Sequence, residues 1–581
     1  MKHSLFHTSI HLKRIAYSLL FIWIASTSAV HAQAPKWVEK AQRAVIKIIT
    51  YDAQSQKIGE GLAFYIDETG TALSSYSLFK GVEKATATDY KGEEHPVDLI
   101  MGFNDLYDVI KVHVAPNGKK KNPYLKLAAQ RPAVGDEATT VGFSENKNKN
   151  YVIGAVEKMD PMDGDSYYTL SMVTTSDMIN TPVLNKNGEV FGMIQPSTNP
   201  SQGKVYALSA HYANNLSIQP LSLNNQKLNA IGIPKDLPTT RDEALTMIYL
   251  AQNARIESPK YLDLINRFIT RYPKDTEGYK IRSTYYTAFF TDEDKLQAAE
   301  EDMKKVAELS SQKDEAFYHT SQCILNYVVR KDTATQAYKD WSYERCLSEI
   351  QKAIEINPLP LYYQQLGNIH SLTQNYREAY EAYEKVNASN LASPSTFYAS
   401  SRLLRLMNDT TGKALSLMDS CIAHFPKPFQ SDAAPYLFER AEMRVAAGND
   451  EGALEDYNAY EQAVHVKQNA LFYYKREQVA VRLKKYDQAM SDIQKALELL
   501  PQDPTLLEEK GSLLVSAARY DEALASLNAA LKIDASRSYS LRLKGFALLQ
   551  QEKKEEAKDA LTRAQELGDT VSAQLLNRYF K

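Results

Sequence analysis

Residues able to do chemistry are sparse in the first 214 positions. Beyond the N-terminal segment this region holds three histidines, His95, His113 and His211, in or beside short apolar runs. A catalytic histidine needs a nucleophile and an orienting carboxylate within hydrogen-bond reach. The region has no GxSxG motif, no HExxH motif and no cysteine. We therefore expect surface or packing histidines, no metal-ligand cluster and no cofactor.

The three cysteines, Cys323, Cys346 and Cys421, lie further along the chain in helical patterns. Three thiols cannot form a disulfide framework in a chain of this length. Outside the cytoplasm a free thiol can react or pair between chains, but we favour small buried hydrophobic side chains. The sequence alone does not decide between reactive or paired thiols and buried packing thiols.

The N-terminus predicts export. Three basic residues precede an apolar run over 15–25, and small residues then lead to Ala32. This order is typical of a secretory signal peptide, so we assign residues 1–32 to it and expect cleavage after Ala32. Because no apolar run is long enough to span a bilayer, we expect a periplasmic or secreted chain without a membrane span.

The overall charge excludes one class of partner. The chain of 581 residues has 68 Lys and Arg against 71 Asp and Glu, a net charge of −3. Removing residues 1–32 takes away three positive charges and no negative ones, which leaves 65 against 71, or −6. Such a balance produces no strong field for a polyanion, so we expect no nucleic-acid partner.

Two periodicities divide the mature chain. From 33 to 214, short β-branched runs alternate with turn residues, which is typical of a barrel or sandwich. Examples are the runs 44–50, 62–66 and 108–112. A polar stretch with three prolines, 215–239, is interpreted as a linker. From 240 onward the pattern is helical, and it opens with a capping box over 240–243.

A 34-residue repeat runs through the helical region. Ala489, Ala523 and Ala557 are 34 residues apart, and Gly511 and Gly545 lie twelve residues before the last two alanines. Helical pairs with small residues at this spacing resemble the tetratricopeptide repeat (TPR).

The resemblance implies an all-α superhelical solenoid, since each TPR must stack on its neighbours to bury its apolar face. About eight or nine repeats are expected over 240–569, with a capping helix over 570–581.

The strand region resembles trypsin-like serine proteases of the HtrA/DegP type. Five stretches look like that family's motifs and occur in the same order. They are Gly59–Asp67 with Gly70–Ser75, Val134–Glu137 with Val141–Phe143, Gly154–Glu157, Pro182–Met193 and Tyr206–Ala210. The resemblance implies an all-β, chymotrypsin-like double barrel ahead of the TPR solenoid.

The same resemblance places three catalytic positions. Ser77 stands at the base histidine, Asp108 at the orienting aspartate, and Ile179 at the nucleophilic serine. A serine hydroxyl is no general base near neutral pH, and isoleucine cannot attack a carbonyl. Three glycines that shape the oxyanion loop are replaced by Asp177, Asn180 and Thr181. We therefore expect no catalytic residues and a vestigial site at these positions.

With the chemistry lost, binding is the predicted function. We expect an exported, catalytically inactive trypsin-like module joined to a TPR scaffold that binds proteins or peptides in the cell envelope. The alternative is an active HtrA-type serine endopeptidase with a nonstandard site. In a third reading the barrel keeps a cleft that binds peptides by strand addition without cutting them.

First-helix positions facing the concave groove of the solenoid are candidates for peptide binding, because they mix aromatic, amide and charged side chains. They are Tyr474, Gln478, Arg482, Glu508, Ser512, Tyr539, Arg542 and Phe546. Each is equally compatible with plain solvent exposure, and the sequence identifies no partner or oligomeric state.

Overall fold

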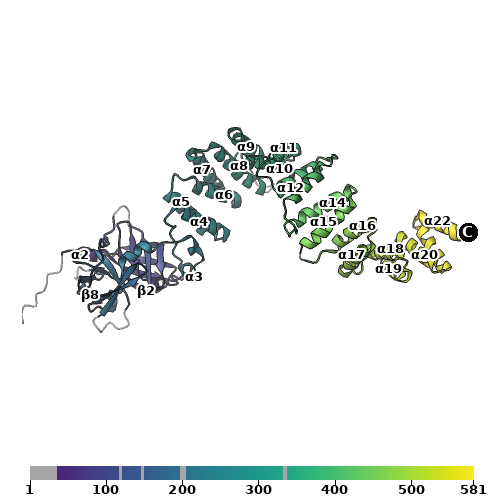
Figure 1. Cartoon of the computed structure of the whole chain (residues 1–581). Coiled ribbons are helices and arrows are strands. Elements are labelled where there is room, and N and C mark those ends of the chain that lie inside the picture. The colour runs from purple at the N-terminus through teal and green to yellow at the C-terminus, as the bar shows by residue number, and fades with distance from the viewer. Residues whose placement is uncertain are drawn as a thin grey trace, which may run out of the picture. The chain divides into compact units, whose positions relative to one another are not determined.

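The computed structural model describes residues 36–116, 121–145, 150–196, 204–331, 337–464 and 466–580. The predicted signal peptide, residues 1–32, lies outside the described residues. The chain divides into two compact units between Gly278 and Tyr279. Figure 1 shows strands in the first unit and stacked helices in the second.

Six antiparallel strands close a first barrel in the order β1-β2-β3-β6-β5-β4. They are β1 (Val45–Tyr51), β2 (Lys57–Tyr65), β3 (Thr71–Ser74), β4 (Lys84–Thr88), β5 (Glu94–Asn104) and β6 (Val109–Val114). The runs predicted over 44–50, 62–66 and 108–112 overlap β1, β2 and β6. Most of their β-branched side chains are buried on one face or the other of these strands, while Ile49 and Ile66 are half-buried.

A second barrel follows with the order β10-β11-β12-β9-β8-β7. Its strands are β7 (Glu137–Val141), β8 (Tyr151–Met162), β9 (Asp165–Ser171), β10 (Pro182–Leu184), β11 (Val190–Ile194) and β12 (Lys204–Ser209). Two closed barrels of six strands confirm the predicted chymotrypsin-like double barrel.

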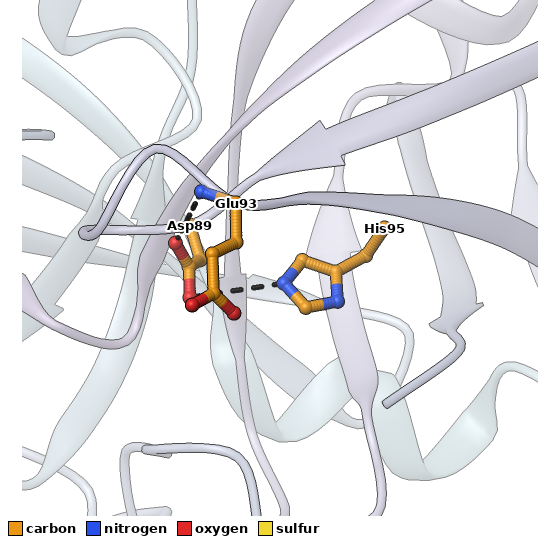
Figure 2. A group of neighbouring side chains, drawn as sticks. All are labelled: Asp89, Glu93 and His95. Carbon is orange, nitrogen blue, oxygen red and sulfur yellow. Dashed lines mark hydrogen bonds and ion pairs between the residues drawn. The ribbon is translucent and has the colours of Figure 1, made fainter. Parts of the chain in front are cut away.

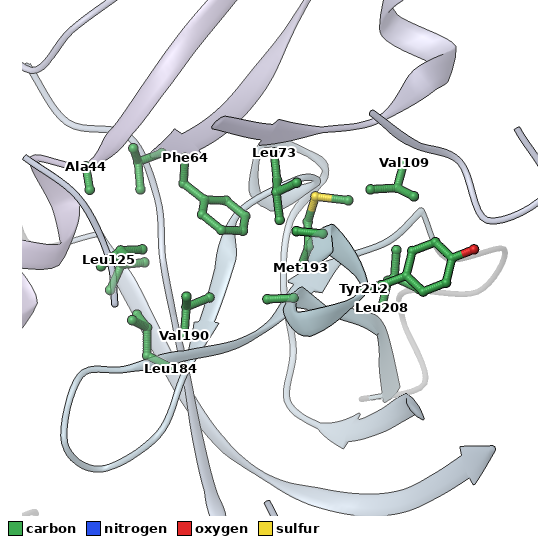
Figure 3. Packing of buried hydrophobic residues seen from close by; sticks show 14 of the residues in the cluster. Ala44, Phe64, Leu73, Val109, Leu125, Leu184, Val190, Met193, Leu208 and Tyr212 are labelled. Atoms are coloured by element: carbon green, nitrogen blue, oxygen red, sulfur yellow. The ribbon is translucent and has the colours of Figure 1, made fainter. Parts of the chain in front are cut away.

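One apolar cluster joins the two barrels. Phe64, Leu73 and Val109 from the first barrel belong to the same buried cluster as Met193 and Leu208 from the second. Figure 3 shows these side chains facing one another across the seam. Close packing at this seam resists displacement, so the loops that leave β3 and enter β10 are held in place beside it.

The segment interpreted as a linker, 215–239, is folded against the first barrel. It contains the 3₁₀ helix η5 (Pro220–Asn224) and the short helix α3 (Gln226–Asn229). Backbone hydrogen bonds of 2.7 Å from Gly232 to the Val82 carbonyl and 2.8 Å from Ile100 to the Pro234 carbonyl attach it. Most of its apolar side chains are buried, although Leu221 is 70% exposed, so the segment extends the barrel domain.

Eighteen helices from α4 to α21 form nine consecutive pairs in the described residues. They are α4 (Arg241–Asn253) with α5 (Ser258–Arg271), α6 (Thr276–Phe289) with α7 (Glu293–Leu309), α8 (Lys313–Arg330) with α9 (Tyr343–Ile356), α10 (Pro360–Leu372) with α11 (Tyr376–Asn387), α12 (Pro394–Leu406) with α13 (Lys413–Ala423), α14 (Ala434–Ala446) with α15 (Asp450–Ala463), α16 (Ala470–Arg482) with α17 (Tyr486–Leu499), α18 (Pro504–Ser516) with α19 (Tyr520–Ile533), and α20 (Ser538–Gln550) with α21 (Lys554–Glu566). A last helix, α22 (Thr570–Tyr579), follows.

The capped helix start at Thr240 and the glycines at helix contacts lie where the sequence predicts them. The Thr240 hydroxyl accepts the Glu243 N–H at 3.3 Å and so caps α4. A Cβ at Gly511 would lie 2.6 Å from Leu527, and one at Gly545 would lie 2.5 Å from Leu561. The two helices of each of these pairs therefore pack with no room for a side chain, which accounts for glycine at these positions.

All three cysteines are buried free thiols. Burial raises the pKa of the Cys323 thiol to about 11, so this thiol is a protonated, unreactive packing group near neutral pH. No helix among the described residues is long and apolar enough to cross a membrane.

Candidate functional site

A cleft of about 560 Å³ lies where loops of the two barrels meet. From the first barrel it is lined by Lys47, Glu60, Gly61, Leu62, Ser75, Ser77 and Leu78. From the second barrel it is lined by Phe143, Asn150, Ser176, Asp177, Ile179, Asn180 and Pro196. Two of the predicted vestigial positions, Ser77 and Ile179, therefore share one cleft. None of the lining residues in the described parts of the chain is a histidine.

Ser77 and Asp108 form a hydrogen-bonded pair beside this cleft. Ser77 lies on the 3₁₀ helix η1 (Tyr76–Phe79), which follows β3. The Asp108 carboxylate accepts the Ser77 N–H at 2.6 Å through Oδ1 and the Ser77 hydroxyl at 2.9 Å through Oδ2. Asp108 thus caps the helix N-terminus, and the Ser77 hydroxyl donates its proton to a carboxylate.

The loop at Ile179 is closed on itself. The 3₁₀ helix η2 (Ser176–Met178) directly precedes Ile179. The Ile179 N–H donates to the Ser176 carbonyl at 3.4 Å, and the Met178 N–H donates to the Thr175 carbonyl at 3.0 Å. An oxyanion hole requires backbone N–H groups aimed at the reacting oxygen, whereas these two are used inside the turn.

Asn180 ties the two sides of the cleft together. Its side-chain amide donates to the Ser75 hydroxyl at 2.9 Å, and its N–H donates to the Ile194 carbonyl at 2.9 Å. Its φ is 67°, so it keeps the left-handed conformation that the replaced glycine would favour, since asparagine tolerates it. Replacing glycine by Asn180, which is 3% exposed, therefore does not prevent a left-handed backbone at this position.

The cleft combines an apolar wall with a charged rim. Leu62, Leu78 and Phe143 are half-buried along the wall. On the rim, Glu60 lies 3.2 Å from Lys47, and hydrogen bonds from Lys57 and then Lys47 lower the pKa of its carboxyl. Such a surface suits an extended polypeptide with apolar side chains.

The eight predicted groove residues lie on α16, α18 and α20. Tyr474, Gln478 and Phe546 are half-buried. Arg482 is exposed and forms a bidentate ion pair with Asp450, with N–O distances of 2.9 and 2.7 Å. These four positions leave side-chain surface open to solvent.

The other four positions are used largely in contacts between neighbouring repeats. Glu508 is buried, and its carboxylate accepts from Arg537 at 2.6 Å and from the Ser540 hydroxyl. The Ser512 and Tyr539 hydroxyls are hydrogen-bonded at 3.1 Å. The Arg542 guanidinium lies 4.7 Å from the centroid of the Tyr539 ring and forms an ion pair with Asp569.

Sequence reasoning missed a hollow elsewhere on the repeats. It has a volume of about 630 Å³ and is lined by side chains of α12, α14, α15 and α16 and of the α15–α16 connection. We call it the aromatic hollow, defined by Tyr398, Phe438, Tyr460, Leu471 and Phe472. The rings of Phe438 and Phe472 each lie within 5.4 Å of the Tyr460 ring. The signal available in the sequence was the 34-residue spacing of Phe438 and Phe472.

Two family models match parts of this architecture. Residues 61–193 match the family model of the trypsin-like peptidase domain, and residues 361–390 match that of the tetratricopeptide repeat. No curated protein matches the chain. The crystal structure of Rv3671c from M. tuberculosis H37Rv, in the inactive form of a serine-to-alanine mutant, is 16% identical, with 34% of this chain and 91% of that chain covered and a TM-score of 0.26. The active form of the Rv3671c protease is 16% identical, with coverages of 36% and 87% and a TM-score of 0.28.

Proposed function

Because the chain carries a trypsin-like peptidase domain followed by tetratricopeptide repeats, we propose that it is an exported, non-catalytic binding protein of the cell envelope. The barrel domain keeps a polypeptide-binding cleft without peptidase chemistry. The repeats bind a protein partner through the aromatic hollow.

The proposed loss of catalysis rests on one observation: Ser77 and Ile179, at the positions of the base and the nucleophile, line the same cleft. A peptidase of this class needs a base beside a nucleophile and amides facing the oxyanion. At the base position the Ser77 hydroxyl donates to Asp108, and at the nucleophile position the side chain is aliphatic. The Ile179 N–H is engaged by the Ser176 carbonyl.

Labelling with a serine-directed fluorophosphonate tests this loss directly. We expect no labelling and no cleavage of unfolded casein, while an active HtrA-type protease run in parallel gives both. The variant Ile179→Ser is expected to stay inactive, because it restores a hydroxyl without a base or an oxyanion hole. Labelling of the wild-type protein, or casein cleavage by the single variant, contradicts the proposal.

The aromatic hollow supports the binding role of the repeats. Binding energy at protein interfaces is concentrated in a few aromatic and aliphatic anchors in pockets, and four aromatic side chains line this hollow. Its one charged lining residue, Glu439, is ion-paired with Arg405. Since no unpaired charge lines it within the described residues, we expect the partner to insert an apolar or aromatic segment.

Crosslinking in the native cells tests this surface with a matched pair of variants. Leu471, 57% exposed, lines the hollow, whereas Ile533, 49% exposed, lies outside it. A partner captured by the wild-type protein should be lost with Leu471→Glu and kept with Ile533→Glu. Equal capture by both variants contradicts binding at the hollow.

Export is tested by the N-terminal sequence of the protein recovered from the periplasm or the medium. We expect it to begin after Ala32, where the basic, apolar and small-residue order ends. Recovery of an uncleaved chain from the cytoplasm contradicts export and leaves the binding proposals intact.

A further inference from the structure

A second polar cluster lies on the β4–β5 hairpin, away from the cleft. Asp89, Glu93 and His95 surround the turn of this hairpin, and one ligand atom from each lies within 4.8 Å of the other two. Figure 2 shows the three side chains converging. From the sequence we expect no metal-ligand cluster here. The signal that this expectation passed over is the spacing Asp-x₃-Glu-x-His around the turn at Gly92.

The hairpin turn fixes the Asp89 carboxylate. Oδ1 of Asp89 accepts the N–H groups of Lys91 at 2.8 Å and Glu93 at 2.9 Å. The turn itself is closed by a 3.0 Å backbone hydrogen bond from Asp89 to the Glu93 carbonyl. Because Oδ1 is held by two amides, Oδ2 is the atom left to face His95.

His95 supplies an independent observation. Its side chain is only 7% exposed, and its Nε2 lies 3.7 Å from Oδ2 of Asp89, which is too long for a hydrogen bond. The ring has no other polar contact in the described part of the chain. The ring nitrogens are not fully enclosed, so an ion from the solvent can reach Nε2 beside the Asp89 carboxylate.

We propose that Asp89, Glu93 and His95 bind a divalent cation of the zinc type. One imidazole nitrogen and two carboxylate oxygens suit Zn²⁺, which is held at about 2.0–2.2 Å by such ligands and accepts water as a fourth. Ca²⁺ requires six to eight oxygen ligands and Mg²⁺ an octahedral set of oxygens, which this cluster does not offer. The cation would cross-link the hairpin turn through these three side chains.

The cleft and this cluster share no residue, so the proposed metal site stands apart from the proposed function. A neighbouring histidine provides the matched control. His113 on β6 also faces a carboxylate, with Nδ1 2.6 Å from Oδ1 of Asp98, but its Nε2 lies 3.0 Å from the Thr69 carbonyl. Among the described residues it belongs to no cluster of three metal-ligand side chains. Removing His113 deletes a half-buried histidine–carboxylate contact without touching the cluster.

Isothermal titration of the purified, tag-free, chelator-treated chain with ZnCl₂ tests the proposal. We expect one equivalent of zinc to bind, with an affinity that depends on the three proposed ligands. His95→Ala and Glu93→Gln should each weaken zinc binding by at least about tenfold. His113→Ala should leave the affinity unchanged. CaCl₂ should give no saturable heat. Because Glu93 is exposed, Glu93→Gln keeps the test valid if His95→Ala fails to fold.

The proposal is overturned by any of three results. The first is no saturable binding of zinc up to about 1 mM. The second is binding that survives both His95→Ala and Glu93→Gln, which places the zinc elsewhere. The third is calcium binding as tight as zinc binding, which identifies an oxygen-only site.

Discussion

Two helical hairpins one repeat apart, α16–α17 and α18–α19, are held together by different contacts, an ion pair in the first and apolar packing in the second. In α16–α17, Arg476 forms a buried bidentate ion pair with Asp492, with N–O distances of 2.8 and 2.7 Å. In α18–α19, the same positions hold Lys510 and Ser526, and the contact is instead Gly511 against Leu527. The repeat therefore fixes where two helices meet, but not whether charge or close apolar packing joins them.

The difference has a consequence at Glu477, which stands 34 residues before Gly511. Its side chain is 1% exposed, and neither carboxylate oxygen has a hydrogen-bond partner within the described residues. Burial, with the like charges of Glu509 and Asp492, raises the pKa of Glu477 to about 8. The ion-paired hairpin thus carries a protonated acid where the apolar hairpin carries glycine.

The largest expected effect comes from breaking the buried pair. Asp492→Ala removes both hydrogen bonds of the bidentate pair and leaves the buried Arg476 guanidinium its ion pair with Glu461 at 2.6 Å. At about 1.5–3 kcal/mol for each hydrogen bond to a charged group, we expect a loss of about 3–5 kcal/mol in the free energy of unfolding. Ser526→Ala at the equivalent position should cost less than about 1 kcal/mol. Hydrogen exchange of α16–α17 and α18–α19 in urea measures both. Equal losses in the two hairpins contradict the comparison.

The next effect is a pH dependence contributed by Glu477 of α16. The folded pKa of Glu477, about 8, lies above its ordinary value of 4.5, so the folded chain binds this proton more tightly than the unfolded chain. Stability is therefore full below about pH 4.5 and falls as the pH rises towards 8. Glu477→Gln should remove this slope and be more stable than wild type by about 2–3 kcal/mol at pH 8.5.

Urea midpoints of the wild type and Glu477→Gln at pH 6 and pH 8.5 provide the measurement. Glu498→Gln is the control, because Glu498 is exposed and paired with Lys467 at 3.1 Å on the surface of the same hairpin. If the slope persists in Glu477→Gln, another group titrates.

Periodic and ordered signals made the fold predictable from the sequence. The alanines at 489, 523 and 557 located the second helices because a spacing of 34 recurs wherever the same helix pair does. The motif order over 59–210 indicated the barrels in the same way. The polar composition of 215–239 concealed its docking, since a few buried side chains such as Ile231 and Ile233 suffice to attach it.

The site was predictable in position but not in its contacts. Ser77, Asp108 and Ile179 were located by resemblance, yet the hydrogen bond between Asn180 and Ser75 joins residues 105 positions apart. No local pattern encodes such a pair. Glu508 looked like a groove residue because its helical position was right, and only the packing of Arg537 against it shows that its carboxylate is used internally.

A third prediction concerns the apolar hairpin. Gly511→Ala places a Cβ 2.6 Å from Leu527, so the helices must separate, and we expect a loss of about 1–3 kcal/mol. Ser516→Ala, an exposed position on the same helix, is expected to change stability by less than about 0.5 kcal/mol. Hydrogen exchange of α18–α19 measures both. A neutral Gly511→Ala contradicts close packing as the means of closure.

The smallest expected effect compares the contribution of an exposed ion pair to stability with that of a buried one. Arg482 and Asp450 form a bidentate pair like that of Arg476 and Asp492, but Arg482 is exposed and its pair is screened by water. Arg482→Ala should therefore cost less than about 1 kcal/mol by urea midpoint. A loss as large as that of Asp492→Ala would show that burial is not what makes the inner pair strong. With the expected small loss, Arg482→Ala is a folded probe, and any weakening of partner capture by it reports a contact at the groove surface.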